Sequence, residues 1–160
     1  MPGNGPKHRI VVGVDGSAPS LRALRWAVQQ AELTGATVDA VIAWQYPAAF
    51  HGYGWGAEMM TGDVDYADIA AKTVDDAISQ AVDLDSEAVV HPVVAEGHPA
   101  QVLIGAARDA DLLVVGSRGH GGFASALLGS VSQHCTHHAP CPVVVIRGVS
   151  PAEEIGGNHV

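Results

Sequence analysis

The chain alternates short apolar runs with longer segments in which apolar residues recur at helical spacing. The runs are rich in valine and isoleucine and are bounded by turn residues, which is typical of strands buried on both faces of a sheet. Strands alternating with helices at this spacing predict a parallel sheet with helices on both faces. We expect strands over residues 10–14, 38–43, 88–94, 111–116 and 142–146.

Four helices are expected between these strands. The first has Pro19 in its first turn and Gly35 as a stop signal. The second begins near Asp63, the third covers residues 99–108, and the fourth begins near residues 124–127. The positions at helical spacing are Leu21, Leu24, Val28 and Ala31 in the first helix, Ile69, Thr73, Ala77, Ile78 and Ala81 in the second, and Leu127, Leu128, Val131, Cys135 and His138 on one side of the fourth.

One long segment, residues 44–62, fits neither pattern. It is rich in glycine and carries Tyr46, Phe50, Tyr53 and Trp55. Loops of this length inside a compact domain are usually either functional lids or disordered. Both interpretations stay open.

Composition limits the class of protein. The 160 residues are 48% hydrophobic and 16% charged, enough for one domain with a core over about residues 8–147 and flexible ends at 1–7 and 148–160. The net charge of −9 argues against non-specific binding to nucleic acid or to an anionic membrane. Two cysteines, no secretory leader pattern and no apolar run of membrane-spanning length favour a reduced, cytoplasmic protein.

The most informative chemistry follows the strand at 111–116. A glycine-rich loop begins at Gly116 and leads to a helix, so unpaired amides and the helix dipole can hold phosphate. Ser117, Ser130 and Ser132 can add hydroxyl donors. In a parallel sheet, ligands bind at the carboxyl ends of the strands where the strand order reverses, so this loop and the one after Val14 are expected to meet. Taken alone, the glycines also fit a simple turn.

The loop is not suited to fast phosphoryl transfer. The P-loop pattern G-x-x-x-x-G-K-[ST] is absent, and the chain has only two lysines, Lys7 and Lys72. A phosphate site without a lysine can bind but is poorly equipped to stabilise developing charge. Ser117 and His120 are close only in sequence, so no catalytic pair is predicted.

The spacing Gly116-x2-Gly119-x9-Gly129-Ser130 resembles the nucleotide-binding pattern of the universal stress protein family. The similarity extends over about residues 8–147. Other segments that look like those of the family are residues 10–17, Ala43-Trp44 at the end of the second strand, Glu96-Gly97-His98-Pro99 before the third helix, and residues 140–145.

The resemblance implies a three-layer α/β fold: a five-stranded parallel sheet of the adenine-nucleotide α-hydrolase-like type, with flavodoxin-like layering. It also implies a homodimer formed through the last strand, residues 143–146. ATP would be the ligand, alone or with Mg²⁺ or Mn²⁺, with the first loop on the adenosine and the end of the second strand on the adenine edge. The residues to which the resemblance assigns nucleotide binding are Asp15, Ala43, Trp44, Val115, Gly116, Ser117, Arg118, Gly119, Gly129, Ser130, Val131 and Ser132.

Simpler roles compete with some of these assignments. Asp15 could merely cap the first helix, Trp44 could be a core aromatic, and Arg118 could be solvated, although a phosphate contact is favoured for it. We interpret the cluster of histidines and cysteines at residues 134–141 as lacking the C-x2-C or H-x3-H pairing of structural zinc sites, and no metal site is expected there.

The predicted function is an ATP-binding stress-response or signalling protein with slow hydrolysis at most. One alternative is an enzyme of the same fold that cleaves or transfers from ATP. Enzymatic relatives carry an S-G-G-x-D-S-type loop after the first strand, which residues 14–20 do not match. The other alternative is a protein-interaction module without a ligand.

Overall fold

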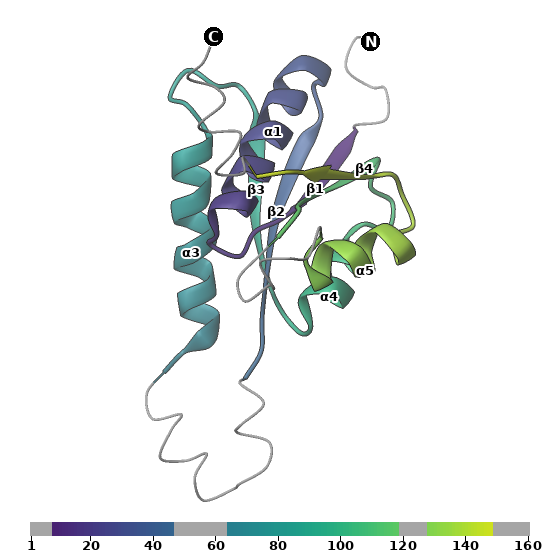
Figure 1. Cartoon of the computed structure of the whole chain (residues 1–160). Helices are drawn as coiled ribbons and strands as arrows, with labels where there is room; N and C mark the ends of the chain where they lie inside the picture. Colours follow the sequence, from purple (N-terminus) through teal and green to yellow (C-terminus); the bar gives the residue numbers. More distant parts are fainter. Residues whose placement is uncertain (1–7, 47–63, 119–127, 149–160) are drawn as a thin grey trace, which may run out of the picture.

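The computed structural model describes residues 8–46, 64–118 and 128–148. All five expected strands and all four expected helices are present, in alternating order (Figure 1). The elements are β1 (Arg9–Gly13), α1 (Ala18–Thr34), β2 (Thr37–Trp44), α3 (Tyr66–Ala81), β3 (Val89–Glu96), α4 (Pro99–Ala106), β4 (Leu112–Gly116), α5 (Ser130–His138) and β5 (Val143–Ile146).

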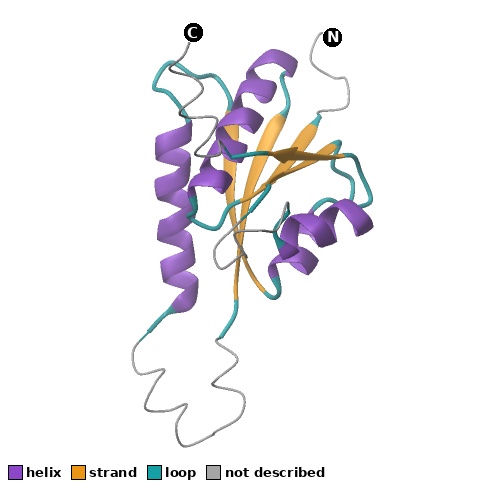
Figure 2. Cartoon of the chain, viewed as in Figure 1, coloured by secondary structure: helices purple, strands orange, loops and turns teal. Residues whose placement is uncertain are grey.

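The five strands form one parallel sheet in the order β3-β2-β1-β4-β5. In the centre of the sheet, Val11 of β1 is in register with Asp39 of β2 and Leu113 of β4. Helices α1 and α3 cover one face of the sheet, and α4 and α5 cover the other (Figure 2). The three-layer α/β prediction is therefore confirmed.

Two apolar cores, one on each face, account for the valine-rich runs. On the α1 and α3 side, Leu24 and Val74 pack with residues of the sheet such as Val12. On the α4 and α5 side, Leu103 and Cys135 pack with Leu113 and its neighbours. Successive residues of a strand point to opposite faces, so a strand covered on both sides must be apolar at nearly every position.

Local signals define the ends of α1. The Ser17 hydroxyl oxygen accepts from the Ser20 amide at the N-cap, and Gly35 takes the left-handed conformation, with φ 78°, at the C-cap. Glycine adopts this conformation without the penalty that a Cβ atom would bring. Gly35 ends the helix as the sequence pattern predicts.

The apolar positions at helical spacing in α3 do not all lie on its buried face. Ile69 is 53% exposed, and the fully buried residues are Ala70, Val74 and Ala77. These positions face α1 and the sheet, so small side chains there allow the helix to pack closely. Ile69 therefore fits the helical spacing of α3 but lies outside its buried face.

The predicted start of the last helix is wrong. Helix α5 begins at Ser130, because Gly129 has an extended backbone with φ −69° and ψ 165° and forms the N-cap. The expected side is correct for Cys135, which is buried, but not for His138, which is exposed beside the His134 ring.

Leu127, residues 47–63 of the long loop and the C-terminal residues 149–160 lie outside the described residues.

A search of the described helices for a segment long and apolar enough to cross a membrane finds none.

Candidate functional site

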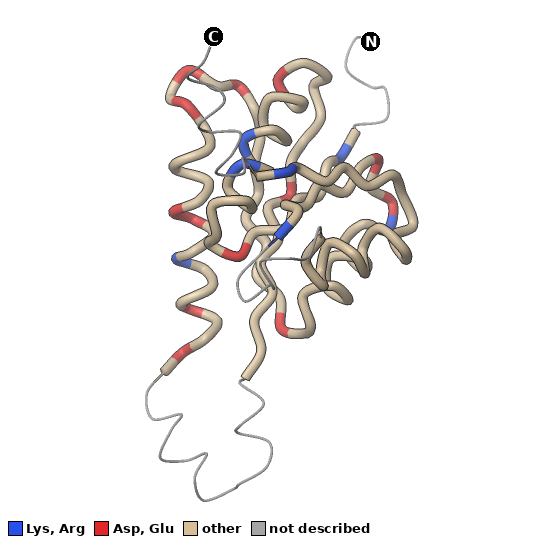
Figure 3. Tube along the Cα trace, in the orientation of Figure 1, with Lys and Arg blue, Asp and Glu red and all other residues tan. Residues whose placement is uncertain are grey.

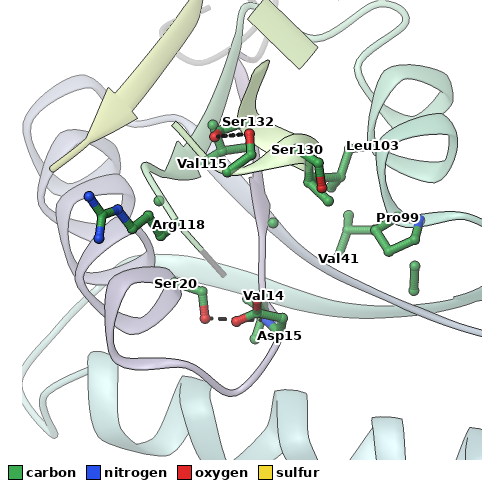
Figure 4. Close-up of a pocket in the computed structure, with 15 residues that line it drawn as sticks. Val14, Asp15, Ser20, Val41, Pro99, Leu103, Val115, Arg118, Ser130 and Ser132 are labelled. Carbon is green, nitrogen blue, oxygen red and sulfur yellow. Dashed lines mark hydrogen bonds between the residues drawn. The ribbon is translucent and has the colours of Figure 1, made fainter. Parts of the chain in front are cut away.

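A cavity of about 260 Å³ opens at the carboxyl ends of the strands, between β1 and β4 (Figure 4). Its lining residues come from the ends of three strands, from the first turns of α1, α4 and α5, and from the loops between. They are Gly13, Val14, Asp15, Ser20, Val41, Ala43, Pro99, Leu103, Val115, Gly116, Arg118, Gly129, Ser130, Val131 and Ser132.

The strand order explains why this cavity forms here. After β1 the chain moves outward to β2 and β3, and it then returns past β1 to form β4 on the other side. The loops after β1 and β4 therefore leave the sheet on opposite faces and open a crevice between them. The predicted meeting of the loop after Val14 with the loop after Val115 is confirmed.

Hydrogen bonds order the loop after β1. One carboxylate oxygen of Asp15 accepts from the Ser17 amide at 2.9 Å and from the Ser17 hydroxyl. The Asp15 amide in turn donates to the Ser20 hydroxyl oxygen at 3.2 Å. Ser17, and not Asp15, is the N-cap of α1. Asp15 supports this cap while its exposed side chain lines the cavity.

On the opposite side, β4 approaches α1 closely. A Cβ atom on Gly116 would lie 2.9 Å from the main-chain carbon and oxygen of Pro19. Glycine is therefore required at Gly116 for the packing of α1 on the end of β4. Its place in the glycine pattern has this structural reason in addition to any contact with a ligand.

The first turn of α5 forms another wall of the cavity. Gly129 is buried and supplies no side-chain cap, so the first amides of α5 have no capping side chain. Residues 129–132 all line the cavity. A helix N-terminus that faces a cavity without a capping side chain carries partial positive charge and unpaired N–H donors, which favour the binding of an anionic group.

The floor of the cavity is apolar. Val41, Pro99 and Leu103 converge on it from β2 and α4 (Figure 4). Leu103 also packs against Gly13, where a Cβ atom would lie only 2.8 Å from its side chain. An apolar floor beside a few polar walls is typical of a small-molecule site. The arrangement suits a ligand with one flat apolar part and one anionic part.

Gly13, Val14, Ser20, Val41, Pro99 and Leu103 are missing from the predicted site. The sequence does carry a signal for Pro99, because the segment Glu96-Gly97-His98-Pro99 resembles the segment that precedes this helix in the family. For Val41 and Leu103 no local signal exists, because their apolar side chains look like ordinary core residues.

Two predicted site residues lie beside the cavity and do not line it. The Trp44 ring packs edge-on against Tyr46, with centroids 5.5 Å apart, and its main-chain oxygen accepts from the Gly97 amide at 2.8 Å. Ser117 is buried, and its main-chain oxygen accepts from the Gly129 amide at 2.6 Å. Both residues position the chain at the site.

Arg118 lines the cavity, but its guanidinium points away from the other labelled residues (Figure 4). It is the only lysine or arginine among the described lining residues, and Asp15 is the only acidic one. Many other acidic residues lie away from the site, along α3 and the turn after it (Figure 3). Gly119 lies outside the described residues.

Three histidines of α5 lie close to one another. The His134 and His138 rings have centroids 4.6 Å apart, and the His137 and His138 rings 6.3 Å. In the part of the chain that the structure covers, no group of three or more His, Cys, Asp or Glu side chains is placed to hold a metal ion.

Comparison with known proteins agrees with this architecture. Residues 7–147 match the model of the universal stress protein family. A universal stress protein of Mycobacterium tuberculosis is 35% identical over 148 residues, which cover 91% of this chain and 46% of that protein. One of Mycolicibacterium smegmatis is 33% identical over 150 residues, covering 89% and 49%. The chain thus spans about half the length of the curated relatives it matches.

Solved structures show the same fold. UspA from Lactobacillus plantarum superposes with a TM-score of 0.67 at 23% identity, over 90% of this chain and all (100%) of that one. A universal stress protein crystallised in complex with cAMP superposes with a TM-score of 0.59 at 26% identity, over 89% of this chain and 98% of that one. The matching family model, the strand order and these superpositions together show that the chain belongs to the universal stress protein family.

Proposed function

We propose that the chain binds ATP or a related adenine nucleotide in the cavity between β1 and β4. The observation that carries this proposal is the combination of an apolar floor with the uncapped N-terminus of α5 in one cavity. The first suits a purine ring, and the second suits phosphate. The cAMP complex of a family member with 26% identity supports an adenine nucleotide as the ligand class.

The geometry suggests a role for each wall. Val41 and Leu103 would pack on the base, and the main chain at Ala43 would face its polar edge. Asp15 would accept hydrogen bonds from the adenosine part. Gly129 and the first turn of α5 would hold the phosphates, together with Arg118 if its side chain turns toward the cavity.

We further propose that the site holds the nucleotide with slow hydrolysis at most. Among the described lining residues there is no lysine or histidine, and Asp15 already accepts two hydrogen bonds from Ser17. A Mg²⁺ or Mn²⁺ ion bound with ATP would take most of its ligands from phosphate oxygens and water. The protein would then serve as a nucleotide-dependent stress-response or signalling module.

Isothermal titration with ATP, ADP, AMP and cAMP, with and without Mg²⁺, tests the proposal. Asp15→Asn keeps an oxygen that can accept from Ser17 but removes the charge, so we expect ATP affinity to fall about tenfold or more. Asp85→Asn, an exposed carboxylate in the turn after α3, is the matched control and should leave affinity unchanged. Absence of ATP binding at millimolar concentration by the folded protein would overturn the proposal.

A homodimer through β5 is the proposed assembly. β5 is an edge strand, and all four of its residues remain half-buried in the single chain. Unprotected apolar edges usually pair, and a two-fold axis would pair β5 with its copy. Sedimentation should show a dimer at micromolar concentration and a monomer for Val145→Lys, while Val89→Lys on the other edge strand should leave the dimer intact. A monomeric wild-type chain would contradict this assembly.

A further inference from the structure

Helix α5 presents a pair of histidines at its carboxyl end. His134 and His138 are one helical turn apart, both are exposed, and their ring centroids are 4.6 Å apart with an angle of 44° between the planes. Side chains four residues apart lie on the same face of a helix. The two imidazoles therefore stand side by side and open to solvent.

We propose that His134 and His138 form a bidentate site for a divalent transition-metal ion that prefers imidazole, namely Cu²⁺, Ni²⁺ or Zn²⁺. Two histidines at this spacing on one helix face are a known metal-binding arrangement. A metal–nitrogen bond of about 2.0–2.1 Å places each ring centroid about 3.2 Å from the ion, so two rings in neighbouring coordination positions have centroids about 4.5–5.2 Å apart. The observed separation falls within this range.

The remaining coordination positions would be filled by water. His137 is adjacent in sequence to His138, but its ring centroid is 6.3 Å from that of His138, outside the range for two neighbouring coordination positions on one ion. Cys135 is fully buried in the core and cannot reach the exposed side of the helix. No set of three ligands is formed by the described residues, so this site differs from a closed structural zinc site.

Imidazole ligands and open water positions favour Cu²⁺ and Ni²⁺ over Mg²⁺ or Ca²⁺, which prefer oxygen ligands. The position of the histidine pair on the helix also favours binding of a metal cation. His138 is the last residue of α5, where the helix dipole places partial negative charge that stabilises a cation.

The site is separate from the nucleotide cavity. Ser130 at the start of α5 lines that cavity, whereas His138 lies at the opposite end of the helix, about 12 Å away along its axis. The expectation that this region binds no metal rests on missing C-x2-C and H-x3-H pairings, and it is wrong for the second, because three residues separate His134 from His138. Metal binding here does not depend on the proposed nucleotide binding.

Titration of the untagged 160-residue chain with NiCl₂ and with CuCl₂ tests the proposal. His134→Gln and His138→Gln should each lower the affinity of this site for the metal ion by about tenfold or more. With one imidazole nitrogen lost, the protein can no longer bind the ion through two ligands at once. His137→Gln is the matched control on the same helix and should bind like the wild type. The electron paramagnetic resonance spectrum of the Cu²⁺ complex should show two imidazole nitrogens in the wild type and fewer in either ligand variant.

All three histidines are exposed, so these substitutions should leave the fold intact, and circular dichroism checks this. Metal should also raise the melting temperature of the wild type and of His137→Gln more than that of either ligand variant. Unchanged affinity and an unchanged Cu²⁺ spectrum in His134→Gln and His138→Gln would overturn the proposal. A loss in His137→Gln as large as in the ligand variants would also overturn it.

Discussion

The Ser132 hydroxyl lies 3.0 Å from the main-chain oxygen of Ser117 and donates a hydrogen bond to it across fourteen intervening positions of the chain. The Gly129 oxygen is also 3.0 Å from this hydroxyl, and the Gly129 amide donates to the same Ser117 oxygen at 2.6 Å. These contacts hold the first turn of α5 against the end of β4. The candidate phosphate-binding amides are therefore positioned in part by a hydrogen bond between two residues that lie far apart in the sequence.

Ser132→Ala should weaken both folding and nucleotide binding. The hydroxyl is buried, so its loss should lower the free energy of unfolding by about 1 kcal/mol in urea denaturation. ATP affinity should fall as well, because the first turn of α5 would be held less firmly. Ser130→Ala is the matched control: its side chain is exposed, so stability should change by less than about 0.5 kcal/mol. Equal free energies of unfolding of the two variants would show that the hydrogen bonds of Ser132 do not stabilise the fold.

Gly116→Ala should destabilise the protein through steric contact. The new Cβ atom would lie 2.9 Å from the main chain of Pro19, which cannot move without shifting α1. We expect a loss of about 1–3 kcal/mol in thermal or chemical denaturation. Gly105→Ala is the control, because a Cβ atom there meets nothing within 4 Å and lies in helix α4, where alanine should add about 0.5–1 kcal/mol. Two variants with the same stability would contradict this assignment.

The stability of the fold at acidic pH should depend on Asp111, which lies just before β4 at the end of the sheet opposite to the cavity. The hydrogen bond from the Arg9 amide, at 2.8 Å, and then the contact with His8 lower the pKa of this carboxyl below its ordinary value of 3.8. A pKa that is lower in the folded state means that the carboxylate adds stability above the unfolded value and loses that contribution as the pH falls through the folded value.

Asp111→Asn should therefore be less stable than the wild type at neutral pH, and the difference should shrink as the pH falls below the ordinary carboxyl pKa of 3.8. Urea denaturation across this range measures it. Asp85→Asn, at an exposed turn, should show no such convergence. A stability difference that stays constant down to the lowest pH would exclude the proposed linkage.

The two cysteines should differ in reactivity. Burial raises the pKa of the Cys135 thiol to about 11, and its side chain is fully buried. Cys141 is only partly buried, and burial raises its pKa as well. At pH 8 iodoacetamide should modify Cys141 slowly in the folded protein and Cys135 only on unfolding, because the thiolate is the reacting form. Mass spectrometry of the labelled peptides checks this, and equal rates at both sites in native buffer would contradict it.

The fold could be predicted from the sequence to a large extent, because each strand and helix carries its own local signal. The valine-rich runs reflect burial on both faces, and Ser17 and Gly35 mark the ends of α1. Alternation of the two element types then implies a parallel sheet, whose strand ends position the loops after Val14 and Val115. For this reason, the two loops that form opposite sides of the cavity could be predicted from the sequence.

Several features depended on the tertiary structure. The floor formed by Val41 and Leu103 follows from how β2 and α4 pack at this edge of the sheet. The position of Trp44 outside the cavity lining and the direction of the Arg118 guanidinium were also visible only in the structure. The same holds for the exposed side of α3 at Ile69, since a helix face becomes buried only where a partner covers it.

By itself, the sequence determined which segments are strands and helices and which loops carry glycine and serine, because periodicity, caps and turns act between residues close along the chain. Only the tertiary structure decided that Ser132 would hold Ser117, that Gly116 would have no room for a side chain, and that α5 would begin at Ser130. These features depend on contacts between residues distant in sequence, and no local pattern specifies the distance between such atoms.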